Sequence, residues 1–295
     1  MSGIEARQAR AGWLLAGPAL GLIAVFFFVP VIAGLALSLT DFDLYSIADP
    51  KNARFIGLRN YTRLFTDPVF WKAFGNTFYF VVVGGTLSVM TSLGAALLVN
   101  AKRARFPGLY RSIYFAPVVT TLVAVAIVWR YVYHPHYGLL NYVLGGLGVS
   151  PIDWLGDPHW AMPAIILMSV WKNFGYNMMI FVAGLQGIPE EQYEAARIDG
   201  AGGWACFQRV TLPNLAPTFL FVGVITMIGF FQLFAEPYVM TQGGPLKSTT
   251  TIVLLMYEEG FRWWRLGTGA AIAFVLFGIT LIGTLIQMRL QRDSR

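Results

Sequence analysis

The sequence predicts an all-α protein that crosses a membrane six times, and three observations support this fold class. The chain of 295 residues is 56% hydrophobic and only 12% charged, whereas a soluble domain carries about 25% charged residues. Its apolar residues gather in runs close to the roughly 20 residues that a helix needs to cross a bilayer. These runs are continuous rather than alternating, which favours helices over barrel strands, the other structure that satisfies its backbone in lipid.

The predicted spans follow one another along a single transmembrane domain, residues 1–295. The apolar cores of five runs contain no Asp, Glu, Lys or Arg, and the fourth contains Lys172. The first run follows Arg7 and Arg10 as a secretory signal would. It is about twice as long as the 7–15 residue core of such a signal, so we expect it to be retained. The spans are placed at residues 12–39, 74–100, 112–132, 160–185, 214–236 and 267–289.

Basic residues beside the spans predict the orientation, because Lys and Arg are retained on the cytoplasmic side. They are Lys102, Arg103, Arg105 and Arg111 after the second span, and Arg289, Arg292 and Arg295 at the C-terminus. Both places are therefore expected in the cytoplasm, together with the N-terminus and the loop at residues 186–213. The link between the first two spans has mixed charges and carries less weight. On this topology the net charge of +6 reflects membrane orientation and does not indicate a nucleic-acid partner.

The loop at residues 186–213 has the features of two short helices around a sharp turn. Pro189 suits the first turn of a helix, and the two glutamates that follow it suit the positive end of a helix dipole. The glycine-rich segment 199–203 permits positive φ. A second helix is predicted from about Gly203 to Leu212, before Pro213. A compact knob of this kind, held outside the membrane, is suited to gripping another protein.

Polar residues in two spans are candidates for binding a solute, because such residues in mid-membrane are functional candidates by default. In the fourth span they recur at i, i+4, i+7 and i+8, which places them on one helical face. The full set is Ser169, Asn173, Tyr176 and Asn177 in the fourth span and Thr226, Phe230 and Gln232 in the fifth. Amides and hydroxyls suit sugar hydroxyl groups, and an aromatic face suits a sugar ring. Alternatively, these side chains only hydrogen-bond between helices as packing.

Lys172 is expected to face another subunit or a wet cavity, where a carboxylate neutralises it, and Glu236 is one candidate. Several chemical sites are not indicated. The segment 244–248 lacks the last glycine of a phosphate loop. His134, His136 and His159 are interpreted as surface residues, and no metal site or catalytic constellation is expected. The single cysteine, Cys206, is expected to be a reduced packing residue.

The loop resembles the E-A-A motif of type I ABC importer permeases. That pattern is E-A-A, three residues, G, nine residues, then I-x-L-P. Glu194, Ala195, Ala196 and Gly200 match it, Val210 replaces the isoleucine, and Leu212 and Pro213 match again. Segments 55–61, 67–71 and 240–245 look like the carbohydrate-uptake branch, with greatest likeness to permease subunits of the maltose, lactose and glycerol-phosphate systems.

The resemblance implies a type I importer permease fold and an assembly around it. Two permease subunits, here expected to be different chains, form the pathway in a bacterial inner membrane. Two ATPase subunits bind ATP and Mg, so no cofactor is expected in this chain, and an extracytoplasmic solute-binding protein delivers the sugar. The loop becomes a coupling helix that docks on the ATPase. The residues assigned to this coupling are Glu194, Ala195, Ala196, Asp199, Gly200 and Pro213.

The resemblance also implies sugar contacts near Ser169, Asn173, Tyr176, Thr226 and Phe230. Asn173 stands where the maltose-type permeases have a small residue, and Phe230 where they have an amide. Alternative functions remain open at this point. They are a type I permease for a polyol, glycerol phosphate or peptide, a channel subunit that works without ATP, and an integral-membrane enzyme.

Overall fold

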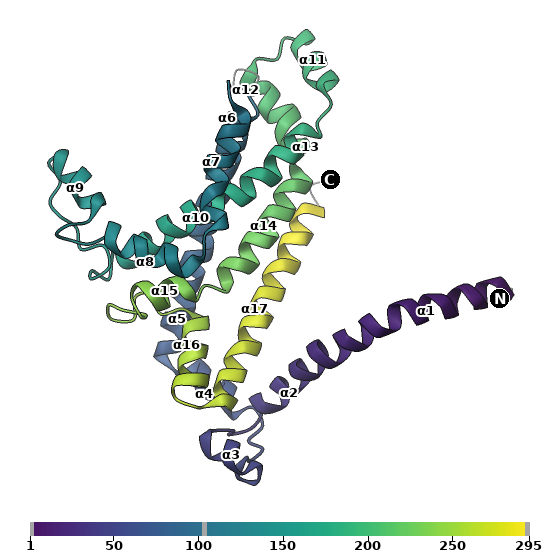
Figure 1. Cartoon of the computed structure of the whole chain (residues 1–295), viewed down its shortest axis with the longest axis vertical. Helices are drawn as coiled ribbons and strands as arrows, with labels where there is room; N and C mark the ends of the chain where they lie inside the picture. Colours follow the sequence, from purple (N-terminus) through teal and green to yellow (C-terminus); the bar gives the residue numbers. More distant parts are fainter. Residues whose placement is uncertain (1–2, 102–104, 293–295) are drawn as a thin grey trace. The chain divides into compact units, whose positions relative to one another are not determined.

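The computed structural model describes residues 3–101 and 105–292. Within them the chain is helical, apart from loops and an isolated antiparallel bridge between Thr40 and Phe55 (Figure 1). Five helices are long and apolar enough to cross a membrane, and a bent pair makes up to six spans. The predicted all-α, membrane-spanning fold class is therefore confirmed. Lys102, Arg103 and Arg295, which bear on the predicted orientation, lie outside the described residues.

The chain divides into two compact units, Met1–Asp67 with Met256–Val275, and Pro68–Leu255 with Leu276–Arg295. The elements of the first unit are α1 (Gly3–Ile23), η1 (Ala24–Phe28), α2 (Val29–Ser38), α3 (Leu44–Ala48), η2 (Pro50–Asn52), α4 (Arg59–Thr66), η5 (Glu258–Arg262) and the first part of α17 (Leu266–Arg292).

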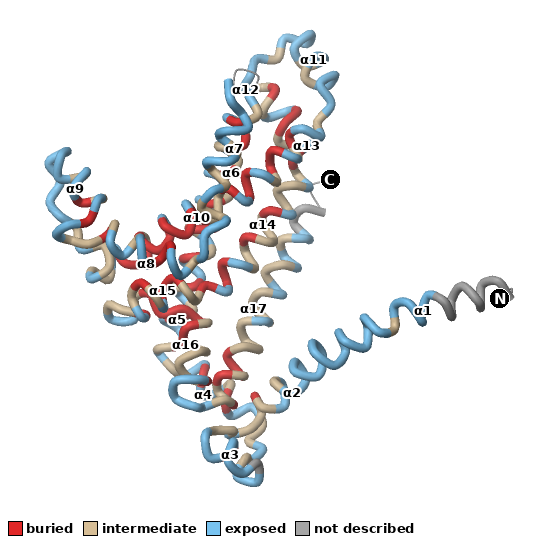
Figure 2. Tube along the Cα trace, in the orientation of Figure 1, coloured by how far each residue is buried: buried red, intermediate tan, exposed pale blue. Residues whose placement is uncertain are grey.

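The first predicted span is one apolar helix, Gly12–Ser38, and its surface is almost entirely exposed (Figure 2). Its end is tied into the first unit by Asn60, whose Nδ2 donates 2.8 Å hydrogen bonds to the carbonyls of Ser38 and Thr40. An apolar surface of this size is stable against lipid or another protein rather than water. The helix thus has the character of a membrane span, as its composition predicted.

The second unit holds the remaining elements. They are α5 (Pro68–Tyr79), η3 (Phe80–Gly84), α6 (Gly85–Val99), α7 (Pro107–Val119), α8 (Leu122–Val132), α9 (Leu139–Gly146), α10 (Ala161–Gln186), α11 (Glu190–Ile198), α12 (Gly203–Cys206), η4 (Phe207–Thr211), α13 (Leu212–Asn214), α14 (Ala216–Phe231), α15 (Ala235–Met240), the rest of α17, and α16 (Ile252–Tyr257) apart from its last two residues, which belong to the first unit.

Helix α10 lies at the centre of the second unit, packed against α6, α7 and α14, and most of its length is buried (Figure 2). The close approach of α7 depends on Gly175, because a Cβ at this position would lie 2.0 Å from the carbonyl oxygen of Tyr114. Small residues permit such approaches between membrane helices. The fourth predicted span is therefore the scaffold on which the other helices of this unit are arranged.

The third predicted span, residues 112–132, is broken, which corrects the expectation of a continuous helix. Helices α7 and α8 meet at an angle of 98°, and Thr120 and Thr121 between them have extended backbones. Pro117 lacks the N–H that the helix needs, and the Thr120 hydroxyl donates to the Pro117 carbonyl at 2.6 Å. The side chain thereby satisfies a carbonyl that the interrupted helix leaves without its usual partner.

The fifth predicted span is also interrupted. Helix α14 ends at Phe231, and α15 begins at Ala235. A continuous helix would bring the ring of Pro237 against the carbonyl of Leu233, four residues earlier. That carbonyl instead accepts a 2.7 Å hydrogen bond from the Thr251 hydroxyl. Two spans of the second unit are thus broken, and α8 and α15, the segments beyond the breaks, pack against each other.

Candidate functional site

A cavity of about 510 Å³ opens in the second unit, between α10, α14 and the break that precedes α15. Six of the seven residues predicted to contact a solute line it. They are Asn173, Tyr176 and Asn177 from α10, Thr226 and Phe230 from α14, and Gln232 from the break. The helical spacing that placed the α10 residues on one face therefore predicted which residues of α10 meet at the cavity.

The seventh predicted residue, Ser169, is fully buried and lies outside the lining of the cavity. Its carbonyl accepts a 2.9 Å hydrogen bond from Asn173 Nδ2, which orients the Asn173 side chain at the cavity wall. Ser169 thus supports the site from behind, because it lies one helical turn away from the lining. Its predicted direct contact with a solute has no geometric support.

The polar residues of the cavity divide into two kinds. Asn177 Nδ2 donates to Thr226 Oγ1 at 2.9 Å, and both residues are buried, so this pair joins α10 to α14 as the packing alternative expected. Tyr176 and Gln232 are exposed, and Asn173 is half-buried. These three present polar groups toward the open space, and their role in solute binding stays a prediction.

Sequence reasoning missed the apolar part of the lining. Phe80 comes from the second span and Leu122 from the start of α8, and Leu233 and Phe234 lie in the break of the fifth span. The Phe80 and Phe230 rings pack with centroids 4.8 Å apart. A proline near each break was the available signal, because Pro117 lies in the last turn of α7 and Pro237 in the first turn of α15, and proline disfavours a continuous helix.

Lys172 faces the same cavity, as the sequence suggested, and Glu236 lines it as well. The Lys172 ammonium donates to the carbonyl of Val118 at 3.0 Å. Val118 lies in the last turn of α7, where helix carbonyls lack intrahelical partners. The two charged groups interact electrostatically, although no direct ion pair joins these two described residues.

The loop with the E-A-A pattern folds into the predicted knob at one end of the second unit (Figure 1). Helix α11 covers Glu190–Ile198, with Pro189 as its N-cap rather than in its first turn. Gly200 ends the turn with φ of +82°, and the amide of Ala201 donates to the carbonyl of Ala196 at 2.8 Å. Such closure by a glycine with positive φ is a common helix C-terminus.

The second helix of the knob runs further than predicted, through α12, η4 and α13 to Asn214, with Pro213 inside it. A proline inside a regular α-helix removes one backbone hydrogen bond and clashes with the carbonyl four residues earlier. The widened π-turn at Phe207–Thr211 changes the backbone spacing there, so the helix continues through Pro213. The Asn214 amide also donates to the Val210 carbonyl at 2.7 Å. The prediction that the helix ends before Pro213 was wrong for this reason.

Side-chain contacts brace the two helices of the knob against each other. The hydroxyls of Tyr193 and Thr211 lie 3.0 Å apart, and Asn214 Nδ2 donates to Gln192 Oε1 at 2.7 Å. Cys206 is buried, and its thiol donates to the Ala201 carbonyl. The knob is therefore a cross-braced pair of helices rather than a flexible loop.

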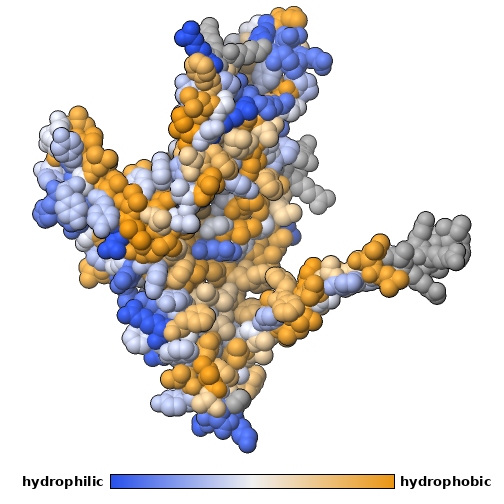
Figure 3. Space-filling model, viewed as in Figure 1, coloured by the Kyte–Doolittle hydropathy of each residue, from blue (hydrophilic) through white to orange (hydrophobic). Residues whose placement is uncertain are grey.

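The outer surface of the knob carries the motif residues. Glu194, Ala195, Asp199, Gly200 and Pro213 are exposed and Ala196 is half-buried. Most of α11 is hydrophilic on its surface (Figure 3), but Ile198 beside the turn is 86% exposed. An exposed isoleucine surrounded by polar groups on a rigid support has the arrangement of a protein contact, an apolar centre with a polar rim.

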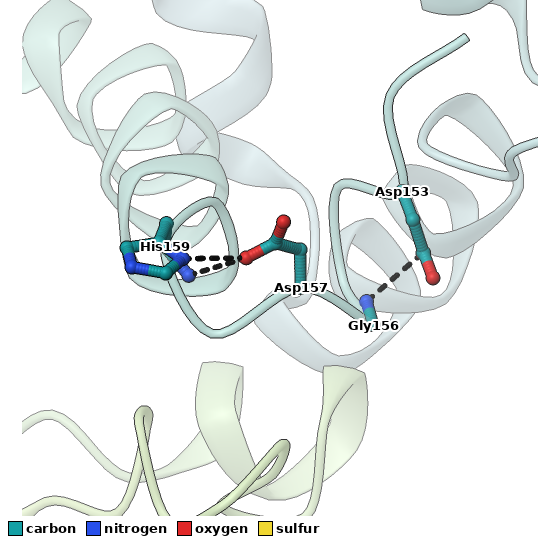
Figure 4. Close-up of polar contacts among 4 residues, drawn as sticks. All are labelled: Asp153, Gly156, Asp157 and His159. Atoms are coloured by element: carbon teal, nitrogen blue, oxygen red, sulfur yellow. Dashed lines mark hydrogen bonds and ion pairs between the residues drawn. The ribbon is translucent and has the colours of Figure 1, made fainter.

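The link before α10 contains a local turn that involves one of the three histidines (Figure 4). Asp157 Oδ1 accepts from the His159 backbone amide at 2.7 Å and lies 3.0 Å from His159 Nδ1. These contacts hold the pKa of Asp157 below its ordinary value, with the backbone hydrogen bond as the largest cause. Among the residues that the structure describes, no cluster of His, Cys, Asp or Glu has the arrangement of a metal site.

Comparison with known proteins agrees with this geometry. A family described as the inner membrane component of binding-protein-dependent transport systems matches residues 88–295. The chain is 36% identical over 289 residues to the lactose transport system permease protein LacF of Rhizobium radiobacter, covering 96% of this chain and 95% of that one. It is 35% identical over 294 residues to the trehalose/maltose transport system permease protein MalF of Thermococcus litoralis, covering 100% and 98%.

A solved structure shares the fold. One chain of a bacterial ABC transporter involved in the import of the acidic polysaccharide alginate superposes with a TM-score of 0.80 at 22% identity, covering 97% of this chain and 98% of that one. The chain belongs to the family of inner membrane components of binding-protein-dependent transport systems. It is a multi-pass permease subunit of an ABC importer, as the E-A-A pattern predicted.

Proposed function

We propose that this chain forms half of the translocation pathway of an ATP-driven sugar importer in a bacterial inner membrane. The observation that carries the proposal is the cavity at the breaks of two spans, where Asn173, Tyr176 and Gln232 stand beside the rings of Phe80 and Phe230. Amide and hydroxyl groups pair with sugar hydroxyls, and ring faces pack against the sugar. The names of relatives that transport lactose and trehalose or maltose support the same substrate class.

The proposed assembly has a second permease, two ATPase subunits and an extracytoplasmic solute-binding protein. The family description, which ties these permeases to a binding protein, supports the last of these partners. ATP and Mg bind to the ATPase subunits in this proposal, and both termini of the permease face the cytoplasm with them. The second permease completes the open side of the cavity, and it is expected to be a different chain.

The E-A-A knob is proposed to transmit ATPase motion to the spans. Its cross-braced helices resist deformation, and α13 leads within two residues into α14, which lines the cavity. A displacement of the knob would therefore be transmitted to α14 through a short, mostly helical connection. Glu194 and Asp199, together with the exposed Ile198, form the proposed contact with the ATPase.

The test is ATP hydrolysis by the purified complex, reconstituted in proteoliposomes with its solute-binding protein. We expect hydrolysis to rise when the binding protein is loaded with a sugar from a panel of mono- and disaccharides. Binding proteins loaded with amino acids or peptides serve as the comparison and are expected to give no stimulation. Sugar accumulation that continues after the ATPase subunits are removed would refute the proposal.

A further inference from the structure

The cavity in the second unit has a simple charge pattern. Among the described residues that line it, Lys172 and Glu236 are the charged ones, and the others are apolar or polar without charge. Each of the two is only 7% exposed. Their formal charges of +1 and −1 cancel, so this half of the cavity is electrically neutral as a whole.

The Lys172 side chain has two interaction partners within this chain. Its ammonium donates to the Val118 carbonyl at 3.0 Å, at the C-terminal end of α7, where the helix dipole is negative. It also interacts electrostatically with Glu236 from the first turn of α15. The ammonium therefore uses one of its three N–H donors on the wall of the cavity, and the opposite formal charge of Glu236 balances its charge within the same lining.

We propose that Lys172 and Glu236 form a charge-compensated pair that makes this cavity select uncharged polyhydroxylated solutes over anionic ones such as uronates and sugar phosphates. The inference rests on the proposed carbohydrate function and narrows its substrate class. It assigns the selectivity to two residues outside the set that the sequence indicated for solute binding.

The physical reason is the cost of bringing an anion into a partly buried space. An anion that leaves water needs a counter-charge or several hydrogen-bond donors to repay its lost hydration. Here the cation is already compensated, and the fixed carboxylate of Glu236 repels a second negative group. A neutral sugar meets no such penalty, because its hydroxyls pair with the uncharged amides of Asn173 and Gln232.

The experiment compares matched neutral and acidic sugars on the purified complex with its partner permease and ATPase subunits. The probes are glucose with glucuronate and galactose with galacturonate, because each pair differs by one carboxylate. Saturation-transfer difference NMR in detergent measures the weak affinities of these sugars for the complex directly. The solute-binding protein is left out, so its own selectivity does not affect the result. The variants are Glu236→Gln, Lys172→Gln and the double variant Lys172→Gln/Glu236→Gln. Glu259→Gln is the control, because Glu259 is an ion-paired glutamate outside the cavity lining.

We expect the wild-type complex to prefer each neutral sugar over its uronate. The quantity compared is the affinity for the uronate divided by the affinity for its neutral sugar. Glu236→Gln leaves the ammonium without its counter-charge and raises this ratio by about tenfold. Lys172→Gln shifts the ratio the opposite way, the double variant returns it to within about twofold of the wild type, and Glu259→Gln leaves it unchanged. Opposite shifts of the ratio in the two single variants distinguish an effect of charge from a loss of packing, because a loss of packing would weaken the binding of both sugars alike.

Equal affinity of the wild type for aldose and uronate would overturn the inference and leave the carbohydrate function standing. So would an unchanged ratio in a folded Glu236→Gln complex, or equal shifts in all three cavity variants. If the Glu236→Gln complex does not assemble, Lys172→Gln provides the test. The ratio of uronate to neutral-sugar affinity should fall in that variant, and an unchanged ratio would refute the proposal. Failure of the wild type to bind any of the four sugars would also overturn this inference, and the carbohydrate function would then be decided separately by whether a sugar-loaded binding protein stimulates ATP hydrolysis.

Discussion

The E-A-A knob and the cavity achieve their geometry in opposite ways. The knob is one contiguous segment, α11 to α13, whose helices are capped and braced by their own side chains. The cavity is assembled from segments distant in sequence and depends on the bend between α7 and α8 and on the short break between α14 and α15. The difference teaches that the part proposed to transmit force is complete within one segment, whereas the part proposed to receive a solute depends on the interruption of helices. Interrupted helices expose backbone and loop groups to a cavity at the depth of the membrane.

The largest expected effect concerns the knob. Glu194→Ala should reduce sugar uptake by more than about tenfold, because truncating one partner of an interfacial charge pair costs about 2–5 kcal/mol of binding. Membrane insertion should be unaffected, since Glu194 is exposed. Uptake and sugar-stimulated ATP hydrolysis measure the effect. Glu191→Ala, in the first turn of the same helix, is the matched control, and wild-type uptake in Glu194→Ala would remove the coupling role.

The next effect concerns the scaffold of the cavity. Gly175→Ala forces a Cβ against the Tyr114 carbonyl and should destabilise the protein by about 1–3 kcal/mol, as overpacking does. Thermal unfolding in detergent measures the loss. Gly94→Ala, in α6 with no atom near its added Cβ, is the control and should leave stability equal or higher. Equal unfolding temperatures in both variants would show that α7 moves away without cost.

A third comparison is made within the cavity. Asn177→Ala breaks the buried bond to Thr226 and should lower stability by about 0.6 kcal/mol, the average for such bonds between membrane helices. Asn173→Ala and Tyr176→Ala should instead raise the half-saturating sugar concentration with little change in unfolding temperature. Uptake kinetics and thermal unfolding of the three variants separate the roles. Unchanged half-saturation in Asn173→Ala and Tyr176→Ala would assign them to packing.

The smallest effect lies in the turn shown in Figure 4. Because the pKa of Asp157 is lowered in the folded chain, its contribution to stability is fully present above the ordinary carboxyl value of 3.8. That contribution is lost as the pH falls through the lower, folded-state pKa. Hydrogen exchange of the peptide around His159 should therefore accelerate below about pH 4. Asp157→Asn should flatten this dependence, and an identical profile in the variant would contradict the assignment.

Much of the knob was predictable, because its signals are local. The two glutamates after Pro189 and the glycine at position 200 mark a helix start and end by their own chemistry. Only the path through Pro213 was missed, since a π-turn has no simple sequence signature. The polar face of α10 was predictable for a similar reason, as spacing alone fixes which residues share a face.

The apolar wall of the cavity was not predictable from spacing. Phe80 and Leu122 look like ordinary residues of apolar spans, and their meeting depends on where the third and fifth spans break. Pro117 and Pro237 marked those breaks, but hydropathy averages over a proline and predicts a continuous span. The contact of Lys172 with Val118 could not be predicted either, because it exists only after the break leaves that carbonyl available.

The bend in the third span has a consequence for the depth at which the chain crosses the bilayer. Helix α7 has 13 residues and rises about 20 Å at 1.5 Å per residue, short of the roughly 30 Å hydrocarbon thickness. Helix α8 turns through 98° and so adds little height along the axis of α7. Backbone without helical partners is stable at that depth only against protein or water. The third crossing must therefore be completed against protein, as where Lys172 of α10 binds the Val118 carbonyl, or beside a hydrated opening, and lipid tails cannot fill that position.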